Sequence, residues 1–336
     1  MTGILLSVTV DEAAVRRLEA LPGVAVRVVK PEGRDWGVSD DLAGGVEVLL
    51  CKYPPRDLAA LTDLKVIQLS TVGYEHLRHL GLADRPLRVC NARGVFDTAI
   101  AEWNLAMMVN LARDLRAMVR NQEQGRWDRD PRFQQEVRGR VVGLWGYGGI
   151  GRETARLAKA FGLTVHALTR AGVRPRRDAY TPPGAGDPEG VLPDRVFVAG
   201  QEREFLSGLD FLVLALPHTQ QSGGLIGEEQ LRALPRTAFL LNPARGPVVH
   251  EAALLRALAE GWIAGAALDT HFAYPLPPGH PLWRAPNVIL TPHVAGGDHS
   301  RAFPARMGDL FVQNVGRYRE GGPLLNELTA REWREA

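Results

Sequence analysis

The sequence predicts an α/β protein made of two doubly wound parallel-sheet domains, and three observations support this class. Short apolar runs alternate with amphipathic stretches from the first residues onward, which is typical of parallel strands joined by helices. A glycine-rich turn, RVVGLWGYGGIG at residues 140–151, joins one apolar run to a helical pattern. The chain has 336 residues, of which 45% are hydrophobic, and this length exceeds one comfortable core and favours two domains.

The first hundred residues predict a small parallel sheet. The expected strands are Ile4–Val8, Val24–Val29, Val46–Cys51, Val66–Ser70 and Val89–Asn91. A helix is expected at Glu12–Ala20 and a helical turn at Leu58–Leu61. Val72 and Gly73 follow the fourth strand, on the carboxyl side of the sheet, where open sheets of this kind bind ligands.

A long helical stretch is predicted next, from Thr98 to Ala117, because apolar residues recur there at spacings of three and four. We expect this helix to lead from the first domain into the second. The segment that follows it, around Gln124–Trp127, is polar and poorly patterned.

The glycine turn predicts a nucleotide site. Residues 141–145 form an apolar run long enough for a buried strand, and Gly146, Gly148 and Gly151 follow as G-x-G-x-x-G before a helix at Glu153–Phe161. Gly146 would make the tight turn, Gly148 would let the backbone approach phosphates, and Gly151 would let the helix pack on the strand. The helix N-terminus offers backbone N–H groups and a positive dipole end to a pyrophosphate. Glycine also marks ordinary turns, so the motif alone is weak evidence.

The remaining chain continues the alternation of strands and helices. The expected strands are Thr164–Leu168, Val196–Val198, Phe211–Leu216, Phe239–Leu241, Gly265–Leu268 and Val288–Leu290. Helices are expected at Gly227–Leu234, Glu251–Glu260 and Arg301–Arg319. The Gly-, Pro- and Arg-rich stretch Ala171–Gly190 predicts an extended surface loop, and Pro323–Asn326 is expected to return to the first domain.

Three polar side chains follow predicted strands at the edge where the glycine turn would present a nucleotide. Arg245, Asp269 and His293 each come directly after an apolar run. An arginine there can bind a carboxylate through two hydrogen bonds, and a histidine can transfer a proton near neutral pH. Each residue also has an ordinary structural interpretation, as a surface ion pair, a helix cap and a turn residue respectively.

At these residues the sequence resembles the D-isomer-specific 2-hydroxyacid dehydrogenases, over nearly its whole length. The segments that match are Asn91…Ala101-Glu102, Gly143–Gly151, Leu216-Pro217…Thr219, Leu241–Gly246, Leu268-Asp269 and Thr291–Gly296. The resemblance implies two Rossmann-like domains with the active site in the cleft between them, and usually a dimer. Residues 1–100 and 297–336 would form the substrate domain, and residues 101–296 the dinucleotide-binding domain.

The resemblance also implies a role for each site residue. Arg245 would bind the carboxylate and carbonyl of a 2-oxo acid, helped by backbone N–H groups of Val72 and Gly73. Nicotinamide would deliver hydride to C2, and His293 would protonate the forming alkoxide, as in glyoxylate/hydroxypyruvate reductases and phosphoglycerate dehydrogenases. The expected cofactor-binding residues are Gly146, Tyr147, Gly148, Gly149, Ile150, Gly151, Thr169, Arg170, Leu216, Pro217, Pro243, Ala244, Asp269 and Gly296.

One departure from the family concerns the catalytic histidine. The family normally has a glutamate that partners this histidine, and Tyr274 occupies its place here, because the surrounding Pro275 and His280-Pro281-Leu282-Trp283 keep register. A carboxylate beside His293 would favour the imidazolium, whereas a phenol can only orient the ring. Glu102 or another carboxylate is an alternative partner for His293. For His271 and His299 a packing or surface role is favoured over catalysis.

A second departure concerns the cofactor. An acidic residue normally ends the second strand in NAD-binding domains and binds the ribose hydroxyls. Here Thr169 and Arg170 stand at that place, with Arg174, Arg176 and Arg177 beyond them. An arginine attracts a 2′-phosphate that an acid would repel, so NAD(P) is expected with NADP(H) favoured over NAD(H). The alternative is that these arginines belong to an exposed loop and bind nothing.

Composition excludes several other classes of protein. The net charge is +2, and apart from Arg174, Arg176 and Arg177 the sequence has no basic run of the kind typical of nucleic-acid binding. No apolar stretch approaches membrane length. Cys51 and Cys90 lack metal-ligand spacing and are expected to be reduced core residues, so no metal is expected. No leader segment is recognised, which favours a cytoplasmic protein.

The leading hypothesis is therefore an NAD(P)-dependent enzyme that interconverts a small 2-oxo acid and a D-2-hydroxy acid. Two alternatives stay open at this point. One is a nucleotide-sensing binding protein of the corepressor type on the same fold, and the other is an oxidoreductase that needs no strong acid or base, as in formate oxidation.

Overall fold

The computed structural model describes residues 1–31, 33–77, 80 and 85–329, and these residues form two compact units. Unit 1 comprises Met1–Phe96, Arg177–Pro182 and Asp298–Ala336, and unit 2 comprises Asp97–Arg176 and Pro183–Gly297. The short insertion 177–182 in unit 1 has no counterpart in the sequence-based prediction.

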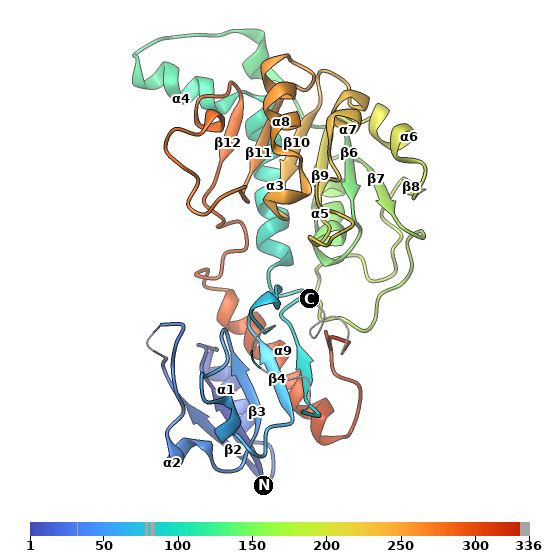
Figure 1. Ribbon diagram of the computed structural model, residues 1–336. Helices are drawn as coiled ribbons and strands as arrows, with labels where there is room; N and C mark the ends of the chain where they lie inside the picture. The colour runs from blue at the N-terminus through green and yellow to red at the C-terminus, as the bar shows by residue number, and fades with distance from the viewer. Residues whose placement is uncertain (32, 78–79, 81–84, 330–336) are drawn as a thin grey trace. The chain divides into compact units, whose positions relative to one another are not determined.

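Unit 1 contains a five-stranded parallel sheet in the order β2-β1-β3-β4-β5. Figure 1 labels β2, β3 and β4 of this sheet. Its strands are β1 (Thr2–Leu6), β2 (Val24–Val28), β3 (Val46–Cys51), β4 (Val66–Leu69) and β5 (Arg88–Cys90). Its helices are α1 (Glu12–Glu19), α2 (Asp40–Ala43) and α9 (Phe303–Arg319), and α1 packs against α9. Apolar clusters cover both faces of the sheet, which is why every residue of the central strands is buried except Thr2 of β1 and Glu47 of β3, which are half-buried.

Both cysteines lie in this core, at the ends of β3 and β5, and both are buried free thiols, as the sequence predicts. Burial raises the pKa of each thiol well above its ordinary value, so neither is a reactive thiolate.

Unit 2 contains a seven-stranded parallel sheet in the order β12-β11-β10-β9-β6-β7-β8. Its strands are β6 (Val141–Trp145), β7 (Thr164–Thr169), β8 (Arg195–Val198), β9 (Phe211–Leu214), β10 (Phe239–Asn242), β11 (Gly265–Leu268) and β12 (Val288–Leu290). The chain builds outward from β6 first in one direction and then in the other. The order therefore reverses between β6 and β9, and this switch point is where open α/β sheets bind ligands.

Helices cover both faces of the unit 2 sheet. They are α3 (Asp97–Ala112), α5 (Gly149–Ala160), α6 (Glu202–Ser207), α7 (Glu228–Ala233) and α8 (Glu251–Ala259). Side chains of α3 and α5 share one apolar cluster, and those of α6, α7 and α8 share another. The predicted fold class, two doubly wound parallel sheets, is confirmed.

The single helix predicted from Thr98 to Ala117 is wrong in one respect. The structure divides it into α3, which ends at Ala112, and α4 (Leu115–Glu123). Asp114 causes the break: its φ of 45° is left-handed, and its side chain caps α4 by accepting a hydrogen bond from the N–H of Ala117 at 3.3 Å. Apolar residues keep their spacing across this break, so the sequence pattern could not reveal where one helix ends and the next begins.

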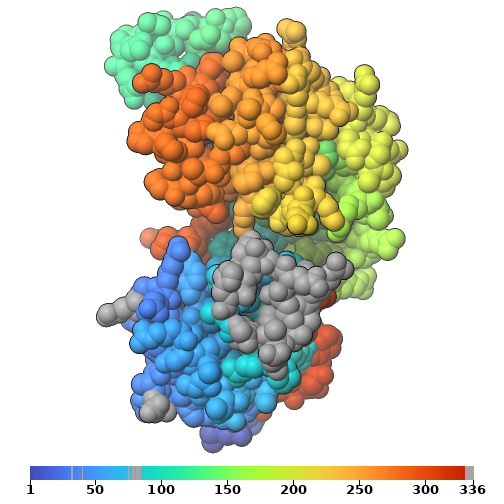
Figure 2. Space-filling model, in the orientation of Figure 1, coloured from blue at the N-terminus to red at the C-terminus, as the bar shows by residue number. Residues whose placement is uncertain are grey.

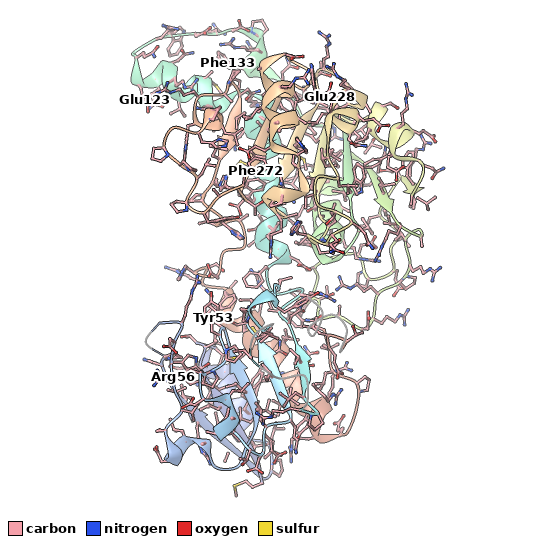
Figure 3. All side chains as sticks on the ribbon, in the orientation of Figure 1. Tyr53, Arg56, Glu123, Phe133, Glu228 and Phe272 are labelled. Atoms are coloured by element: carbon pink, nitrogen blue, oxygen red, sulfur yellow. The ribbon has the colours of Figure 1, made fainter. Side chains whose placement is uncertain are left out.

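Residues 113–139 stand out from the surface of unit 2 (Figure 2). No residue of α4 is buried, and Glu123 at its end lies at the outer edge of this segment (Figure 3). Phe133, which belongs to the short helical turn Pro131–Gln134, is buried. We call residues 113–139 the arm.

The predicted surface loop at Ala171–Gly190 is only partly a surface loop. Tyr180 is buried in the core of unit 1, where its N–H donates to the Asn326 side chain at 3.2 Å. Asp187 is buried in unit 2. Composition rich in Gly, Pro and Arg indicates irregular backbone, which is correct, but it does not indicate exposure.

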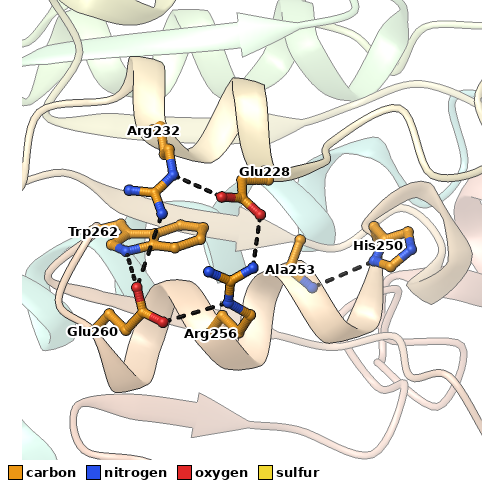
Figure 4. Close-up of polar contacts among 7 residues, drawn as sticks. All are labelled: Glu228, Arg232, His250, Ala253, Arg256, Glu260 and Trp262. Carbon is orange, nitrogen blue, oxygen red and sulfur yellow. Dashed lines mark hydrogen bonds and ion pairs between the residues drawn. The ribbon is translucent and has the colours of Figure 1, made fainter.

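A cluster of two arginines, two glutamates and Trp262 joins α7 to α8 on the outside of unit 2 (Figure 4). Trp262 is buried, and Arg232 stacks on its ring with the guanidinium carbon 3.5 Å from the ring centroid. The ion pairs around it are about half exposed and contribute little to stability. Burial of the indole is therefore the dominant stabilising term of this cluster.

None of the helices in the part of the chain that the structure describes is both long enough and apolar enough to cross a membrane.

Candidate functional site

The glycine turn between β6 and α5 has the geometry that the sequence predicts. Gly146 has φ of 103°, and a Cβ on it would collide with the carbonyl oxygen of Ala215. A Cβ on Gly151 would collide with the carbonyl oxygen of Gly146, so α5 can begin this close to β6 only with glycine at 151. Gly148, the N-cap of α5, is exposed and faces open space. The first turn of α5 is thus open to an anion on the Gly148 side.

The Tyr147 side chain points into unit 2 rather than toward this open side. Its hydroxyl donates to the Asp187 carboxylate at 2.7 Å, and the ring is buried. Only the Tyr147 backbone is left to serve the predicted role in cofactor binding.

Asp187 anchors the 171–194 segment to the glycine turn. It also accepts hydrogen bonds from the N–H groups of Gly190, Val191 and Leu192 at 3.0 to 3.1 Å. Burial by itself raises the pKa of this carboxyl, but these N–H groups and the Tyr147 hydroxyl outweigh it and hold the pKa below its ordinary value. Asp187 is consequently ionised at neutral pH.

Arg152, one residue beyond the glycine motif, is the buried cation beside this carboxylate. Its guanidinium donates to the carbonyl oxygens of Tyr147, Asp187 and Arg174. A buried guanidinium needs such partners, because an uncompensated charge is costly. The backbone on both sides of the glycine turn is thereby fixed before any ligand binds.

The end of β7 presents the residues expected at the adenosine ribose. Thr169 is half-buried, and its Oγ1 is buried without a hydrogen-bond partner. Arg170 is exposed and makes no hydrogen bond or ion pair with the residues that the structure describes. An orphaned hydroxyl and an uncommitted guanidinium suit a ribose and its 2′-phosphate respectively.

The predicted residues Leu216 and Pro217 follow β9, at the switch point beside the glycine turn. Ala215, one residue earlier, donates its N–H to Trp145 and has its carbonyl against Gly146. Leu216 is half-buried and Pro217 is exposed.

Asn242 holds the turn that follows β10. Its side chain donates to the Arg245 carbonyl at 2.9 Å and accepts from the Ala244 N–H at 3.1 Å, so Pro243 and Ala244 are buried inside the turn. At Gly246 this turn packs directly against the turn that contains His271, because a Cβ on Gly246 would collide with the carbonyl oxygen of His271. Sequence reasoning identified the turn but missed the role of Asn242.

Arg245 is half-buried at this turn. One guanidinium N–H donates to the Ala244 carbonyl at 2.8 Å, and within the described part of the chain no carboxylate contacts the guanidinium. An arginine held by its own backbone, with no acidic partner, can bind an anionic ligand.

Asp269 organises the turn that carries His293. The carboxylate is buried, with Oδ1 accepting from the Thr291 hydroxyl at 2.6 Å and the Val294 N–H at 2.9 Å. Oδ2 accepts from the Ala295 N–H at 3.0 Å. Since β11 and β12 are neighbours, Asp269 joins the carboxyl ends of both strands.

His293 is exposed at the head of this turn and has φ of 58°, in the left-handed region that side chains other than glycine rarely adopt. Its N–H donates to the Thr291 carbonyl at 3.0 Å. The hydrogen bonds to Asp269 on either side maintain this conformation. Gly296, predicted to contact cofactor, ends the turn and is half-buried.

Tyr274 lies beside His293, with ring centroids 5.6 Å apart and the ring planes at 51°. Its hydroxyl accepts from the His271 N–H at 3.2 Å, so the phenol is oriented by the neighbouring turn. Tyr274 is 59% exposed. The structure therefore brings together the two rings that the sequence predicts to be neighbours.

His271 has a structural role, as the sequence favours. It is buried, and its Nε2 lies 2.8 Å from the Thr291 carbonyl, which places the hydrogen on Nε2. Trp103 of α3 also reaches this turn, and its Nε1 donates to the Thr291 hydroxyl at 3.2 Å. Glu102, considered as a partner for His293, is exposed and forms no hydrogen bond or ion pair with described residues.

Val72 and Gly73, the predicted substrate-binding residues of unit 1, form a turn after β4. The Val72 carbonyl accepts from the Asn91 side chain at 2.9 Å, and the Gly73 carbonyl accepts from the Thr71 hydroxyl at 2.7 Å. Both carbonyls are thus occupied, and the two N–H groups have no acceptor among the described residues.

The chain is similar to known proteins over most of its length. Residues 105–295 match the model of the NAD binding domain of the D-isomer specific 2-hydroxyacid dehydrogenases. A glyoxylate reductase of Thermofilum pendens is 33% identical over 318 residues, covering 90% of this chain and 89% of that protein. A glyoxylate reductase of Korarchaeum cryptofilum is 34% identical over 266 residues, covering 78% and 75% respectively.

A solved structure shows the same fold with a cofactor. A D-isomer specific 2-hydroxyacid dehydrogenase from Xanthobacter autotrophicus Py2, in complex with NADPH and MES, is 29% identical and superposes with a TM-score of 0.75. The likeness covers 98% of this chain and 99% of that one.

The Asp269 contacts predict a measurable cost when the carboxylate is lost. Asp269→Ala removes the acceptor of the Thr291 hydroxyl and of the Val294 and Ala295 N–H groups, and we expect it to lower the free energy of unfolding by about 3 kcal/mol. Thr291→Val removes the hydroxyl with its bonds to Asp269 and Trp103 but keeps both backbone N–H bonds of the turn, so it should cost less, about 1 kcal/mol. Urea unfolding measures both, and equal losses in the two variants would contradict the account.

Proposed function

Because the chain belongs to the D-isomer-specific 2-hydroxyacid dehydrogenase family, we propose that it reduces a small 2-oxo acid of the glyoxylate or hydroxypyruvate type to the D-2-hydroxy acid, with NADPH as the preferred reductant. The general reaction, NAD(P)-dependent oxidation and reduction of 2-hydroxy acids and 2-oxo acids, is that of the family. The observation that supports the proposal most is the placement of Arg245, Asp269 and His293 at the carboxyl ends of three neighbouring strands, β10, β11 and β12.

The residues of the site fit a nicotinamide dinucleotide. The open first turn of α5, the orphaned Thr169 hydroxyl and the uncommitted Arg170 are the features such a ligand needs. When bound, the nicotinamide supplies the hydride that reduces C2 of the oxo acid.

In the proposed mechanism Arg245 binds the substrate carboxylate and fixes the orientation of the adjacent carbonyl. His293 in its imidazolium form donates a proton to the carbonyl oxygen as C2 becomes tetrahedral, so that a ketone or aldehyde, a hydride and a proton give one hydroxyl. Tyr274 limits the rotation of the imidazole through ring contact. The contribution of Val72 and Gly73 stays a prediction.

The binding-protein alternative of the corepressor type gains no support, since the relatives are named reductases. The alternative of formate-type chemistry has no observation in its favour either. A cytoplasmic location stays a prediction.

Loss of Arg245 should affect chemistry more than cofactor binding. We expect Arg245→Lys to lower kcat/KM for glyoxylate by at least about a hundredfold, since a lysine cannot provide the bidentate fork that orients the carboxylate. The Kd for NADPH, measured by fluorescence titration, should stay unchanged. A lysine variant with near-normal kcat/KM would remove Arg245 from the mechanism.

Cofactor preference should depend on Arg170. We expect wild-type protein to bind NADPH more tightly than NADH, and Arg170→Ala to weaken NADPH binding about tenfold or more while NADH binding is unchanged. Arg203→Ala, which removes another exposed arginine of unit 2, is the matched control. Tighter binding of NADH by the wild type, or an unchanged ratio in the variant, would contradict the proposal.

The pH dependence of reduction should respond to Tyr274. A carboxylate beside His293 favours the imidazolium, so Tyr274→Glu should move the alkaline decline of kcat/KM for reduction upward by about one pH unit or more. Tyr274→Phe keeps the ring without adding charge and should leave the profile in place. A wild-type profile that is already flat to alkaline pH would show that another acid partners His293.

We also propose that the protein is a homodimer that buries the arm. Leu115 and Val119, one helical turn apart on α4, are 42% and 44% exposed, and Trp127 is 90% exposed. Several exposed apolar side chains on one projecting segment are typical of an interface.

Sedimentation equilibrium tests this proposal. We expect a dimer for the wild type and a monomer for Val119→Glu, whereas Val198→Glu, at an apolar residue 37% exposed on β8, should remain dimeric. A monomeric wild type, or a dimeric Val119→Glu variant, would contradict it.

A further inference from the structure

Two side chains of opposite charge flank the first residue of α5. A Cβ on Gly149 would overlap the carboxylate of Asp97, so this carboxylate lies against the Gly149 backbone. The Nη1 atom of Arg176 lies 3.3 Å from the same Cβ position. Neither residue belongs to the glycine motif: Asp97 begins α3, and Arg176 lies in the long segment after β7.

This location gives the Asp97 carboxylate an electrostatic consequence. The N-terminus of a helix carries a partial positive charge and unpaired N–H groups, which is why it binds the pyrophosphate of a dinucleotide. Asp97 places a negative charge at that N-terminus in the protein itself. The Asp97 carboxylate therefore stabilises the N-terminus of α5 when no cofactor is bound, and it repels a phosphate that approaches from the Gly148 side. Arg176 attracts the same phosphate.

We propose that Asp97 is an internal anion that competes with the cofactor pyrophosphate for the N-terminus of α5, and that Arg176 is the cation that favours the pyrophosphate there. The proposal rests on the dinucleotide-binding function proposed above. It makes Asp97 a residue that limits cofactor affinity, whichever nicotinamide dinucleotide is bound.

The positions of these residues in the chain add a second consequence. Asp97 is the first residue of unit 2, and Arg176 is the last residue before the 177–182 segment of unit 1. When a pyrophosphate displaces the Asp97 carboxylate, the change occurs directly at two of the connections between the units. Backbone exchange at these connections should therefore respond to the pyrophosphate.

The first test measures affinity. We expect Asp97→Asn to bind NADPH and NADH about three- to tenfold more tightly than the wild type, because one like charge near the pyrophosphate is removed. The affinity for adenosine, which has no phosphate, should not change. Arg176→Gln should weaken both dinucleotides by a similar factor.

The matched control is Asp114→Asn, since α3 of 16 residues separates Asp114 from Asp97 by about 25 Å. Asparagine also caps helices well, so this variant removes the same charge with little effect on folding. It should bind both dinucleotides as the wild type does.

Asp97 also lies in the first turn of α3, where an acidic residue stabilises a helix. If that is its whole role, Asp97→Asn lowers the melting temperature and leaves the Kd values unchanged or weaker, and the proposal is overturned.

A second measurement uses the wild type, so it does not depend on the folding of any variant. Hydrogen–deuterium exchange should change in peptides covering residues 93–100 and 171–180 when NADPH is added, but not when adenosine is added. No change with NADPH would overturn the proposal.

These outcomes are distinct from failure of the proposed function. Wild-type protein that binds neither dinucleotide would refute both. Normal turnover of oxo acids together with unchanged affinity in Asp97→Asn would refute this inference alone.

Discussion

The Asp269 carboxylate is the constraint on which the candidate site depends most directly. It is buried, and it accepts hydrogen bonds from Thr291, Val294 and Ala295. Without these bonds the left-handed backbone at His293 would have little to maintain it. Since the backbone N–H of Asp269 also donates to the Asn242 carbonyl at the end of β10, this one residue connects three strand ends.

Two buried charged residues, Arg152 and Asp187, fix the glycine turn of unit 2 as Asp269 fixes the turn that carries His293. Arg152 donates only to backbone carbonyls, and Asp187 accepts from a tyrosine hydroxyl and three backbone N–H groups. Charged side chains that bind backbone in this way fix loop geometry, and these hydrogen bonds offset the cost of burying the charges. The glycine turn is therefore rigid on its inner side and open on its outer side.

Periodicity and turn chemistry were sufficient to predict the fold class, because buried parallel strands give short apolar runs and the glycine turn has few other uses. They placed Arg245, Asp269 and His293 at strand ends, since strand order in such sheets follows from the alternation. Contacts between distant segments could not be predicted. Asp114 looks like any surface acid, Tyr180 and Asp187 lie in a stretch of loop composition, and nothing local indicates that Asp97 meets Gly149.

The central claim is that these strand ends form the catalytic groups of a D-specific 2-oxo acid reductase. The most direct measurement incubates the protein with hydroxypyruvate and NADPH and separates the glycerate enantiomers by chiral chromatography. The account predicts D-glycerate alone, formed in step with the oxidation of NADPH. Formation of L-glycerate or a racemic mixture, or no oxidation of NADPH with either hydroxypyruvate or glyoxylate, would contradict it.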